Sequence, residues 1–366
     1  MLKPGFLSIC LLVALVGCST ASRRADESAT TGWGPLETTN AAPAESEHVT
    51  EGPQVAPPPV NLPEPLRPTT PVVHETWIPV ERWARENNFG TLRETSPTPA
   101  PTYALTTAQG LLRFQIKSQL AKWNGLDFHL GFEPLLLGGE PFMHTLDLEK
   151  NIRPLLRSFA VPTKTNRVIV LDPGHGGKDV GTSSYLGHGS EKEFTLDWAR
   201  RLAHVLETNG WQVWLTRTSD VDMVLSNRVA FAEEHHADVF ISLHFNSIAP
   251  SLEQAGLETY CLTPTGMPST IKRGNQDDVS LAFPNNAFDE ANYQLALGVH
   301  RALLKHVGES DRGVRRARFL GVLRGQNRPA ILIEGGYLSN PREARRIADP
   351  AFRQKLADAV ARALSP

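Results

Sequence analysis

The chain has 366 residues and a formal net charge of −2, with 40% hydrophobic and 21% charged residues. This length is enough for two domains and their connections, since one domain usually takes about 100–200 residues. The near balance of acidic and basic residues argues against a nucleic-acid partner. Of three cysteines, only Cys261 lies beyond residue 18. The composition therefore excludes a disulfide framework and a cysteine-rich structural zinc site.

Residues 1–18 have the features of a secretory signal peptide. Lys3 supplies a positive charge, and the apolar stretch 6–16 is too short to span a membrane comfortably. The segment ends in Leu-Val-Gly-Cys at Cys18, which resembles the lipobox of bacterial lipoproteins, where the cysteine becomes acylated. Ser19 after it resembles the outer-membrane sorting class. The resemblance implies a lipid anchor on the periplasmic side of the outer membrane, or on the outer face of the plasma membrane. The alternative is an ordinary signal peptide with a chance cysteine.

Two regions separate this signal from the main domain. Residues 19–71 are rich in Pro, Ser, Thr, Ala and Glu, with Trp33 as their one aromatic residue, and we expect a disordered tether. Residues 72–156 are expected to form a small α+β domain. It resembles the small wall-associated domains of secreted bacterial hydrolases, which implies peptidoglycan binding; a structural spacer is the alternative. Its expected elements are a strand and helix near 77–86, strands at 111–116, 127–130 and 134–137, a turn at 138–139 and a helix at 144–156.

From residue 165 to the C-terminus, strand-like and helix-like segments alternate. This rhythm predicts a three-layer α/β domain, in which a mostly parallel sheet carries helices on both faces. The first helix is expected to begin after Ser190 and to end near Gly210. The expected strands are 168–171, 213–216, 239–243, 257–262, 319–323 and 330–333.

Four polar residues stand at strand ends and a helix start, where packing alone would not select them. His175 follows the first strand in a glycine-rich turn, Glu191 opens the next helix, His244 ends a third strand and Glu334 ends the last one. Ligands and catalytic groups collect at the carboxyl ends of parallel strands. Two imidazoles and one carboxylate form a catalytic zinc set with an open position for water. Glu334 is then placed to act as general base on that water.

Each of these residues also has a purely structural explanation. A carboxylate such as Glu191 is favoured at any helix N-terminus. His175 taken alone fits a solvated turn, and His244 fits a hydrogen-bonded core histidine. Glu334 is harder to explain in this way, because a carboxylate leaving a buried strand is costly without a partner. No His-Glu-x-x-His run makes the signal local, so the proximity of these residues depends on the fold.

Other polar residues of this region are given lesser roles. Arg217 and Arg228 are candidates for holding substrate carboxylates, but a solvated or salt-bridged arginine is the default assignment. Asn246 and Ser247 follow His244 closely enough to line the cleft. The remaining histidines are expected to be exposed at His188, to close a helix at His235 and His236, and to serve packing or the surface at His300 and His306.

Taken together, six ordered motifs resemble the zinc-dependent N-acetylmuramoyl-L-alanine amidases of the amidase-3 family. The resemblance covers about 200 residues from Arg167 onward, and it implies zinc bound by His175, Glu191 and His244, with Glu334 as the catalytic glutamate. It also implies hydrolysis of the amide between N-acetylmuramic acid and L-alanine in peptidoglycan. The motifs lie at residues 172–178, 191–192, 242–247, 256–260, 311–314 and 329–341.

Some members of that family carry an inhibitory helix that an activator protein displaces. Here residues 263–289 are rich in Pro, Gly, Asn and Asp, without a helical period, so they are predicted to form a cleft-side loop. We therefore expect no activator protein. Two other functions remain open at this stage: a non-catalytic peptidoglycan-binding lipoprotein that keeps the fold as a scaffold, and a zinc peptidase that cuts within the stem peptide.

Overall fold

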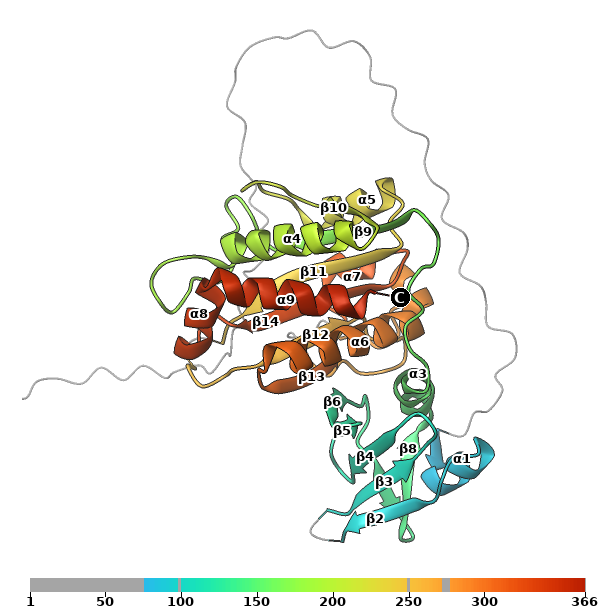
Figure 1. Cartoon of the computed structure of the whole chain (residues 1–366). Helices are drawn as coiled ribbons and strands as arrows, with labels where there is room; N and C mark the ends of the chain where they lie inside the picture. Colours follow the sequence, from blue (N-terminus) through green and yellow to red (C-terminus); the bar gives the residue numbers. More distant parts are fainter. Residues whose placement is uncertain (1–75, 98–99, 249–250, 272–276, 366) are drawn as a thin grey trace, which may run out of the picture.

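The computed structural model describes residues 76–97, 100–248, 251–271 and 277–365. The signal peptide, Cys18 and the tether at 19–71 lie outside these residues. Figure 1 shows an N-terminal part, up to α3, and a larger C-terminal part that begins with β9. Within the described ranges, no helix combines the length and apolar character needed to cross a bilayer.

The C-terminal part has the predicted three-layer α/β architecture. In Figure 1, α4, α6 and α9 lie along one face of the sheet, while α5 and α7 lie on its other side. The strands are β9 (Arg167–Pro173), β10 (Trp211–Leu215), β11 (Val239–Asn246), β12 (Leu257–Cys261), β13 (Asp311–Arg316) and β14 (Ala330–Tyr337). The helices are α4 (Glu191–Thr208), α5 (Leu225–Glu234), η2 (Pro284–Phe288), α6 (Asp289–Val307), α7 (Gly321–Arg324), α8 (Pro341–Ala348) and α9 (Pro350–Ala363).

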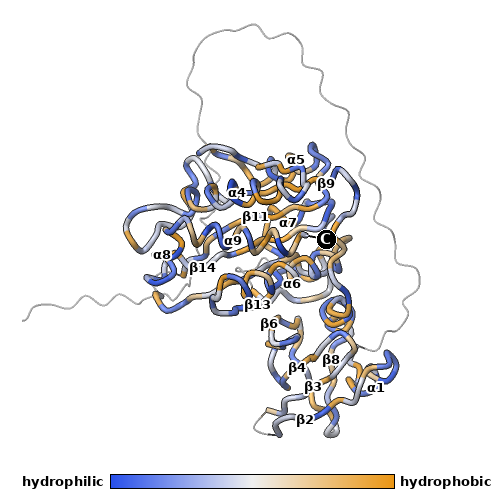
Figure 2. Tube along the Cα trace, viewed as in Figure 1, coloured by the Kyte–Doolittle hydropathy of each residue, from blue (hydrophilic) through white to orange (hydrophobic). Residues whose placement is uncertain are grey.

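The central strands form because both of their faces are buried. Successive side chains of β9 point to opposite faces of the sheet, so Ile169 and Leu171 join the core beneath α4, α6 and α9. Val168 and Val170 join a second core beneath α5 and α7. Figure 2 shows apolar residues concentrated in the strands between these layers. Such continuous apolar runs are typical of parallel strands that are covered on both sides.

Strand direction changes once within the C-terminal part, and this change shapes the site. β10, β9, β11 and β14 are neighbours in that order and run parallel. β12 pairs antiparallel with β14, which places Glu258 directly opposite Glu334. β13 in turn runs parallel to β12. The carboxyl ends of four strands therefore meet the beginnings of β12 and β13 at one edge of the sheet.

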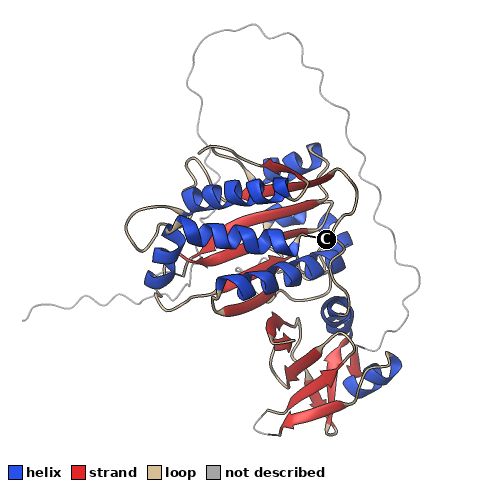
Figure 3. Ribbon diagram, in the orientation of Figure 1, coloured by secondary structure: helices blue, strands red, loops and turns tan. Residues whose placement is uncertain are grey.

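The N-terminal part consists mainly of strands, as Figure 3 shows. Its β6 pairs with β13 through Val314 and Phe128, so both parts share one 11-stranded sheet, and the core on the α6 side is continuous between them. The elements are β1 (Trp77–Pro79), α1 (Val80–Glu86), β2 (Leu92–Ser96), β3 (Thr102–Thr106), β4 (Leu111–Gln115), β5 (Leu120–Trp123), β6 (Leu126–His129), β7 (Leu135–Leu137), β8 (Glu140–His144), α2 (Thr145–Asp147), η1 (Leu148–Ile152) and α3 (Arg153–Leu155).

Two sequence-based expectations about these elements are wrong. The apolar run at 319–323 is not a strand; it leads into the short helix α7 and packs against the α5 side of the sheet. Residues Asp311–Arg316 form the strand β13 instead, between β12 and β6, and their arginine-rich sequence does not alternate clearly. The segment 263–289 does not begin at the cleft, because β12 carries the chain away from Glu334 toward the opposite edge. Strands β2, β3 and β5 were not predicted.

Candidate active site

His175 stands where β9 ends, in a turn that only a glycine-rich sequence can form closely around it. Its own φ is +62°, in the left-handed region that non-glycine residues seldom occupy. A Cβ on Gly174 would lie 2.2 Å from Cε1 of His244, and one on Gly181 would lie 2.7 Å from Oε2 of Glu191. The glycines therefore allow three elements to approach one another.

His175, Glu191 and His244 converge, although they lie far apart in the sequence. Oε1 of Glu191 is 3.1 Å from Nε2 of His175 and 2.9 Å from Nδ1 of His244. Their candidate ligand atoms all lie within 4.8 Å of one another, and the three side chains are buried. Ligand atoms around a tetrahedral zinc ion are roughly 3.4 Å apart at bond lengths near 2.1 Å. The donor set and its spacing fit a zinc ion.

Hydrogen bonds to backbone and side-chain groups orient these candidate ligands. Nδ1 of His175 lies 2.8 Å from Oδ1 of Asp179, which leaves Nε2 facing the cluster. Oε2 of Glu191 accepts the amide N–H of Thr182, and Oε1 accepts that of Phe245. Outer partners of this kind fix the orientation of metal-binding histidines. Asp179 was not predicted from the sequence, although it lies four residues after His175.

Glu334 adjoins the cluster through the register of the sheet. In β14 it lies opposite His244 on one side and Glu258 on the other. It is buried, and its Oε2 has no hydrogen-bond partner within the described residues. A buried polar atom without a partner is costly, so its retention points to a ligand or substrate group. Glu258 is a second buried carboxylate, and it was not predicted from the sequence.

The charges of the cluster depend on one another. Burial opposes ionisation of Glu191, but hydrogen bonds from His175 and His244 hold its pKa below the usual range. Burial lowers the pKa of His244, whereas Asp179 and Glu191 outweigh burial and raise that of His175 to about 9. Burial, together with the charges of Glu191 and Glu258, raises the pKa of Glu334 well above its ordinary value. The negative charges of Glu191 and Glu258 thus make ionisation of Glu334 less favourable.

Arg217 and Arg228 are engaged with the protein and do not point freely into the cleft. Arg228 donates to Oδ1 of Asp172 and to the carbonyl oxygens of Pro173 and His175. Arg217 donates to the carbonyl oxygens of Pro173 and Gly174. Both guanidinium groups are therefore buried, and they stabilise the turn that carries His175. Arg228 forms an ion pair with Asp172, as its default assignment expected. Arg217 is neither solvated nor salt-bridged within the described residues, because it is buried and binds carbonyl oxygens.

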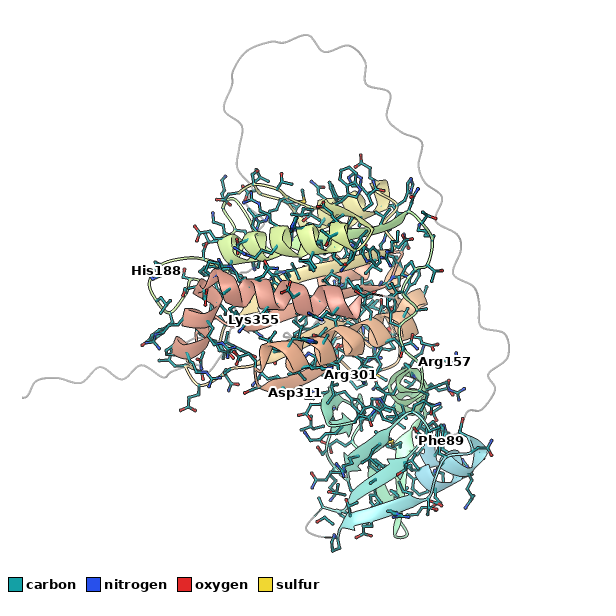
Figure 4. All side chains as sticks on the ribbon, viewed as in Figure 1. Phe89, Arg157, His188, Arg301, Asp311 and Lys355 are labelled. Atoms are coloured by element: carbon teal, nitrogen blue, oxygen red, sulfur yellow. The ribbon has the colours of Figure 1, made fainter. Side chains whose placement is uncertain are left out.

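Among the described residues, no further histidine belongs to the cluster. His188 is exposed, and Figure 4 shows it at the outer edge of its loop. His235 stacks on Trp214 at a centroid distance of 4.1 Å. His300 is fully buried, with Nδ1 3.0 Å from Oγ1 of Thr259 and Nε2 3.0 Å from Oδ1 of Asp311. Asn246 and Ser247 follow the cluster, and Asn246 donates to Oε2 of Glu258.

Comparison with known proteins identifies the family. A profile of the Amidase_3 family, described as N-acetylmuramoyl-L-alanine amidase, matches residues 169–366. The amidase AmiA of Escherichia coli (strain K12) is 31% identical over 218 residues, which cover 53% of this chain and 74% of the relative. The amidase CwlM of Bacillus licheniformis is 34% identical over 200 residues, which cover 54% of this chain and 67% of the relative.

A solved structure shows the same relationship by sequence. The catalytic domain of the amidase CwlV from Bacillus (Paenibacillus) polymyxa var. colistinus is 31% identical, with a TM-score of 0.45. The alignment covers 54% of this chain and 95% of that domain. The matched family region contains all four predicted site residues. The chain belongs to the Amidase_3 family of N-acetylmuramoyl-L-alanine amidases, which are peptidoglycan hydrolases.

Proposed function

We propose that this amidase acts through one zinc ion held by His175, Glu191 and His244, with Glu334 as its catalytic base. The observation that carries this proposal is the convergence of three candidate ligands from three separate elements, with all candidate ligand atoms within 4.8 Å of one another. Two imidazoles and one carboxylate favour zinc over Mg²⁺ or Ca²⁺, which prefer oxygen ligands. A zinc ion held by these three side chains would keep a coordination position for water or a substrate carbonyl.

The reaction is hydrolysis of the amide between the lactyl group of N-acetylmuramic acid and L-alanine. A zinc ion at such a site supplies Lewis acidity toward a carbonyl oxygen and toward water. Glu334 accepts a proton from the attacking water as the new C–O bond forms. It then gives that proton to the alanine nitrogen as the C–N bond breaks. The unpartnered Oε2 of Glu334 is the atom that holds the proton in transit.

Substitution of Glu334 tests this assignment. Glu334→Gln keeps the size of the side chain but removes its capacity to accept the proton, so we expect hydrolysis of purified sacculi to fall at least about a thousandfold. Zinc content, measured by elemental mass spectrometry, should stay near that of the parent protein because Glu334 is not a ligand. Retained turnover in Glu334→Gln contradicts the role of Glu334.

The same digests separate this amidase from the two alternative functions. Mass spectrometry of the products should show free stem peptides and glycan strands without peptides. A peptidase acting within the stem would instead leave shortened peptides on muramic acid, and a binding protein would release nothing. His175→Ala, Glu191→Ala and His244→Ala should each lower the zinc content, whereas Arg362→Gln on α9, an exposed position, should not.

We also propose that Cys18 carries a lipid anchor that holds the enzyme on the periplasmic side of the outer membrane. Its support is the Leu-Val-Gly-Cys sequence at the end of the apolar segment and Ser19 after it. Detergent partitioning of the protein produced in a Gram-negative host tests this. The parent protein should enter the detergent phase and incorporate labelled fatty acid, and Cys18→Ser should do neither. Fractionation of the two membranes then tests which of them carries the anchor.

The roles of the remaining segments stay predictions. The division into an accessory domain at 72–156 and a catalytic domain at 165–366 is to be tested by limited proteolysis of the connection between them. We propose that the accessory domain contacts peptidoglycan, with a spacer role as the alternative. We further propose that no activator protein is required, so the purified protein should digest sacculi alone. Activity that appears only after a cell extract is added would contradict this.

A further inference from the structure

A buried carboxylate next to Glu334 has no task in the reaction described above. Glu258 lies at the start of β12, and its side chain is 2% exposed. Its position in the register gives the row His244, Glu334 and Glu258 across three neighbouring strands. Register partners project from the same face of a sheet, so Glu258 extends the floor of the site away from the metal cluster.

The two carboxylate oxygens of Glu258 accept hydrogen bonds from residues of several elements. Oε2 accepts from Nδ2 of Asn246 at 3.0 Å and from the hydroxyl of Tyr260 at 2.7 Å. Oε1 accepts from Nε of Arg312 at 2.8 Å and lies 3.3 Å from Nε of Arg315. Arginine attraction, together with these hydrogen bonds, outweighs burial and keeps the pKa of Glu258 low. One negative charge thus faces two arginines.

The two arginines keep donors that Glu258 does not use. Arg312 gives Nη1 to Oε1 of Gln254, while its Nη2 makes no hydrogen bond within the described residues. Arg315 uses Nε on the carbonyl oxygen of Arg312, and both its Nη atoms are likewise unused there. Their side chains are 25% and 17% exposed, so these donors can be reached from solvent. The cluster formed by Glu258, Arg312 and Arg315 therefore carries an excess positive charge.

This cluster lies within reach of a substrate held at Glu334. Arg312 stacks over the ring of Tyr337, three residues beyond Glu334 on β14, at 5.1 Å from the ring centroid. β13 is two strand spacings from β14, or about 10 Å. An extended peptide advances about 3.3 Å per residue, so about three residues bridge this distance. The N-terminal part lies on the far side of β13, because Val314 pairs with Phe128 of β6.

We propose that Arg312 and Arg315, held in place by Glu258, form a subsite that binds a carboxylate of the stem peptide, at its second or third residue from the scissile bond. Guanidinium groups bind carboxylates through paired hydrogen bonds. The buried Glu258 holds the two guanidinium groups in a fixed orientation. This subsite rests on the proposed function of Glu334 and the metal cluster. It would give the enzyme a preference for acidic stem peptides.

The first test changes the substrate and leaves the protein intact. Two soluble muramoyl peptides are compared as substrates of the zinc-loaded full-length protein. One has free carboxylates at its second and third residues, and in the other these groups are amidated. We expect kcat/KM to fall about 10- to 100-fold on amidation, mainly through KM, because a charge-assisted hydrogen bond is lost. Equal kcat/KM on both peptides overturns the subsite. Absence of any hydrolysis of the acidic peptide would instead count against the proposed function itself.

The second test crosses the substrate pair with variants of the subsite. Arg315→Gln should lower kcat/KM on the acidic peptide by about tenfold and leave the amidated peptide nearly unaffected. Arg312→Lys keeps the charge beside Glu258, so the fold is protected, but it removes the planar fork and should halve or further reduce the preference. Arg362→Gln on α9 is the matched control and should preserve it. An equal loss on both peptides in Arg315→Gln means a structural role and overturns the proposal.

Discussion

At the scale of single residues, the site depends on two glycines, which have no side chain, as much as on the candidate ligands. Gly174 has a φ that other residues accept, yet nothing larger fits there because the ring of His244 occupies the place of a Cβ. Gly181 faces Glu191 and His175 in the same way, and its φ of +66° adds backbone strain to the collision. Close approach of the three candidate ligands therefore requires glycine at both positions.

Gly174→Ala should displace the His244 ring and so weaken metal binding. We expect zinc affinity to fall at least tenfold, since the added Cβ would sit 2.2 Å from Cε1 of His244. Competition with a chromogenic chelator measures this affinity. Gly298→Ala on α6 serves as control, because a Cβ at that position meets nothing within 4 Å. A Gly174→Ala protein with the zinc affinity of the control would show that the backbone yields and the collision is relieved.

At the scale of elements, β13 connects the two parts of the chain through the carboxylate of Asp311. Its Oδ2 accepts the amide N–H of Asp127 on β6, while Oδ1 accepts the N–H of Gly313 and faces His300. Figure 4 places Asp311 on the edge of the C-terminal part that faces the N-terminal part. One side chain thus ties the pairing of β13 with β6 to the buried ring of His300 on α6.

Asp311→Ala should weaken this junction more than an average surface change does. Removal of the carboxylate leaves the buried Nε2 of His300 and two amide groups without their acceptor, which costs about 3 kcal/mol. Urea unfolding measures the loss, and proteolysis between α3 and β9 should become faster. Glu234→Ala, at an exposed position of α5, provides the comparison. Unfolding free energies that match for the two variants would remove Asp311 from this role.

At the scale of the whole molecule, the N-terminal part is built into the same sheet and core as the catalytic machinery. Arg316 at the end of β13 is fully buried, donates from Nε to Asn151 of η1 and lies over the ring of Tyr293 at 4.3 Å. Lys150 pairs with Asp289 at the start of α6. The contacts between the two parts are polar as well as apolar, so they fix orientation as well as proximity.

His129 should make the stability of this junction depend on acid. Burial and the charge of Arg315 lower its pKa to about 4 from the ordinary value of 6.5. The unfolded chain takes up the proton near pH 6.5, so the contribution of neutral His129 is complete above pH 6.5 and is lost as pH falls toward 4. Between pH 7 and 4 the parent protein should lose about 2–3 kcal/mol more unfolding free energy than His129→Gln does. Urea unfolding across this range measures it, and parallel pH curves for the two proteins would contradict it.

The sequence predicted the parts of the molecule whose signal is local. Apolar runs that stop at polar residues revealed β9, β11 and β14, together with the residues at their ends, and Glu191 followed a clear helix start. Glu258 was missed because its asparagine and arginine partners lie on other strands, and Asp179 because an acid in a loop usually faces solvent. The reversal of β12 could not be predicted, since strand direction leaves no mark in a five-residue strand sequence. The pairing of β6 with β13 is equally non-local.

The reversal of β12 also decides where the chain tolerates change. The connection from β12 to α6 leaves the sheet at the edge opposite the metal cluster, where Asn285 donates to the carbonyl oxygens of Gln326 and Arg328 just before β14. Doubling the length of such a loop costs only about 0.6 kcal/mol of closure entropy. This connection is therefore the place to insert a reporter domain or an affinity tag, because added residues would grow away from the substrate.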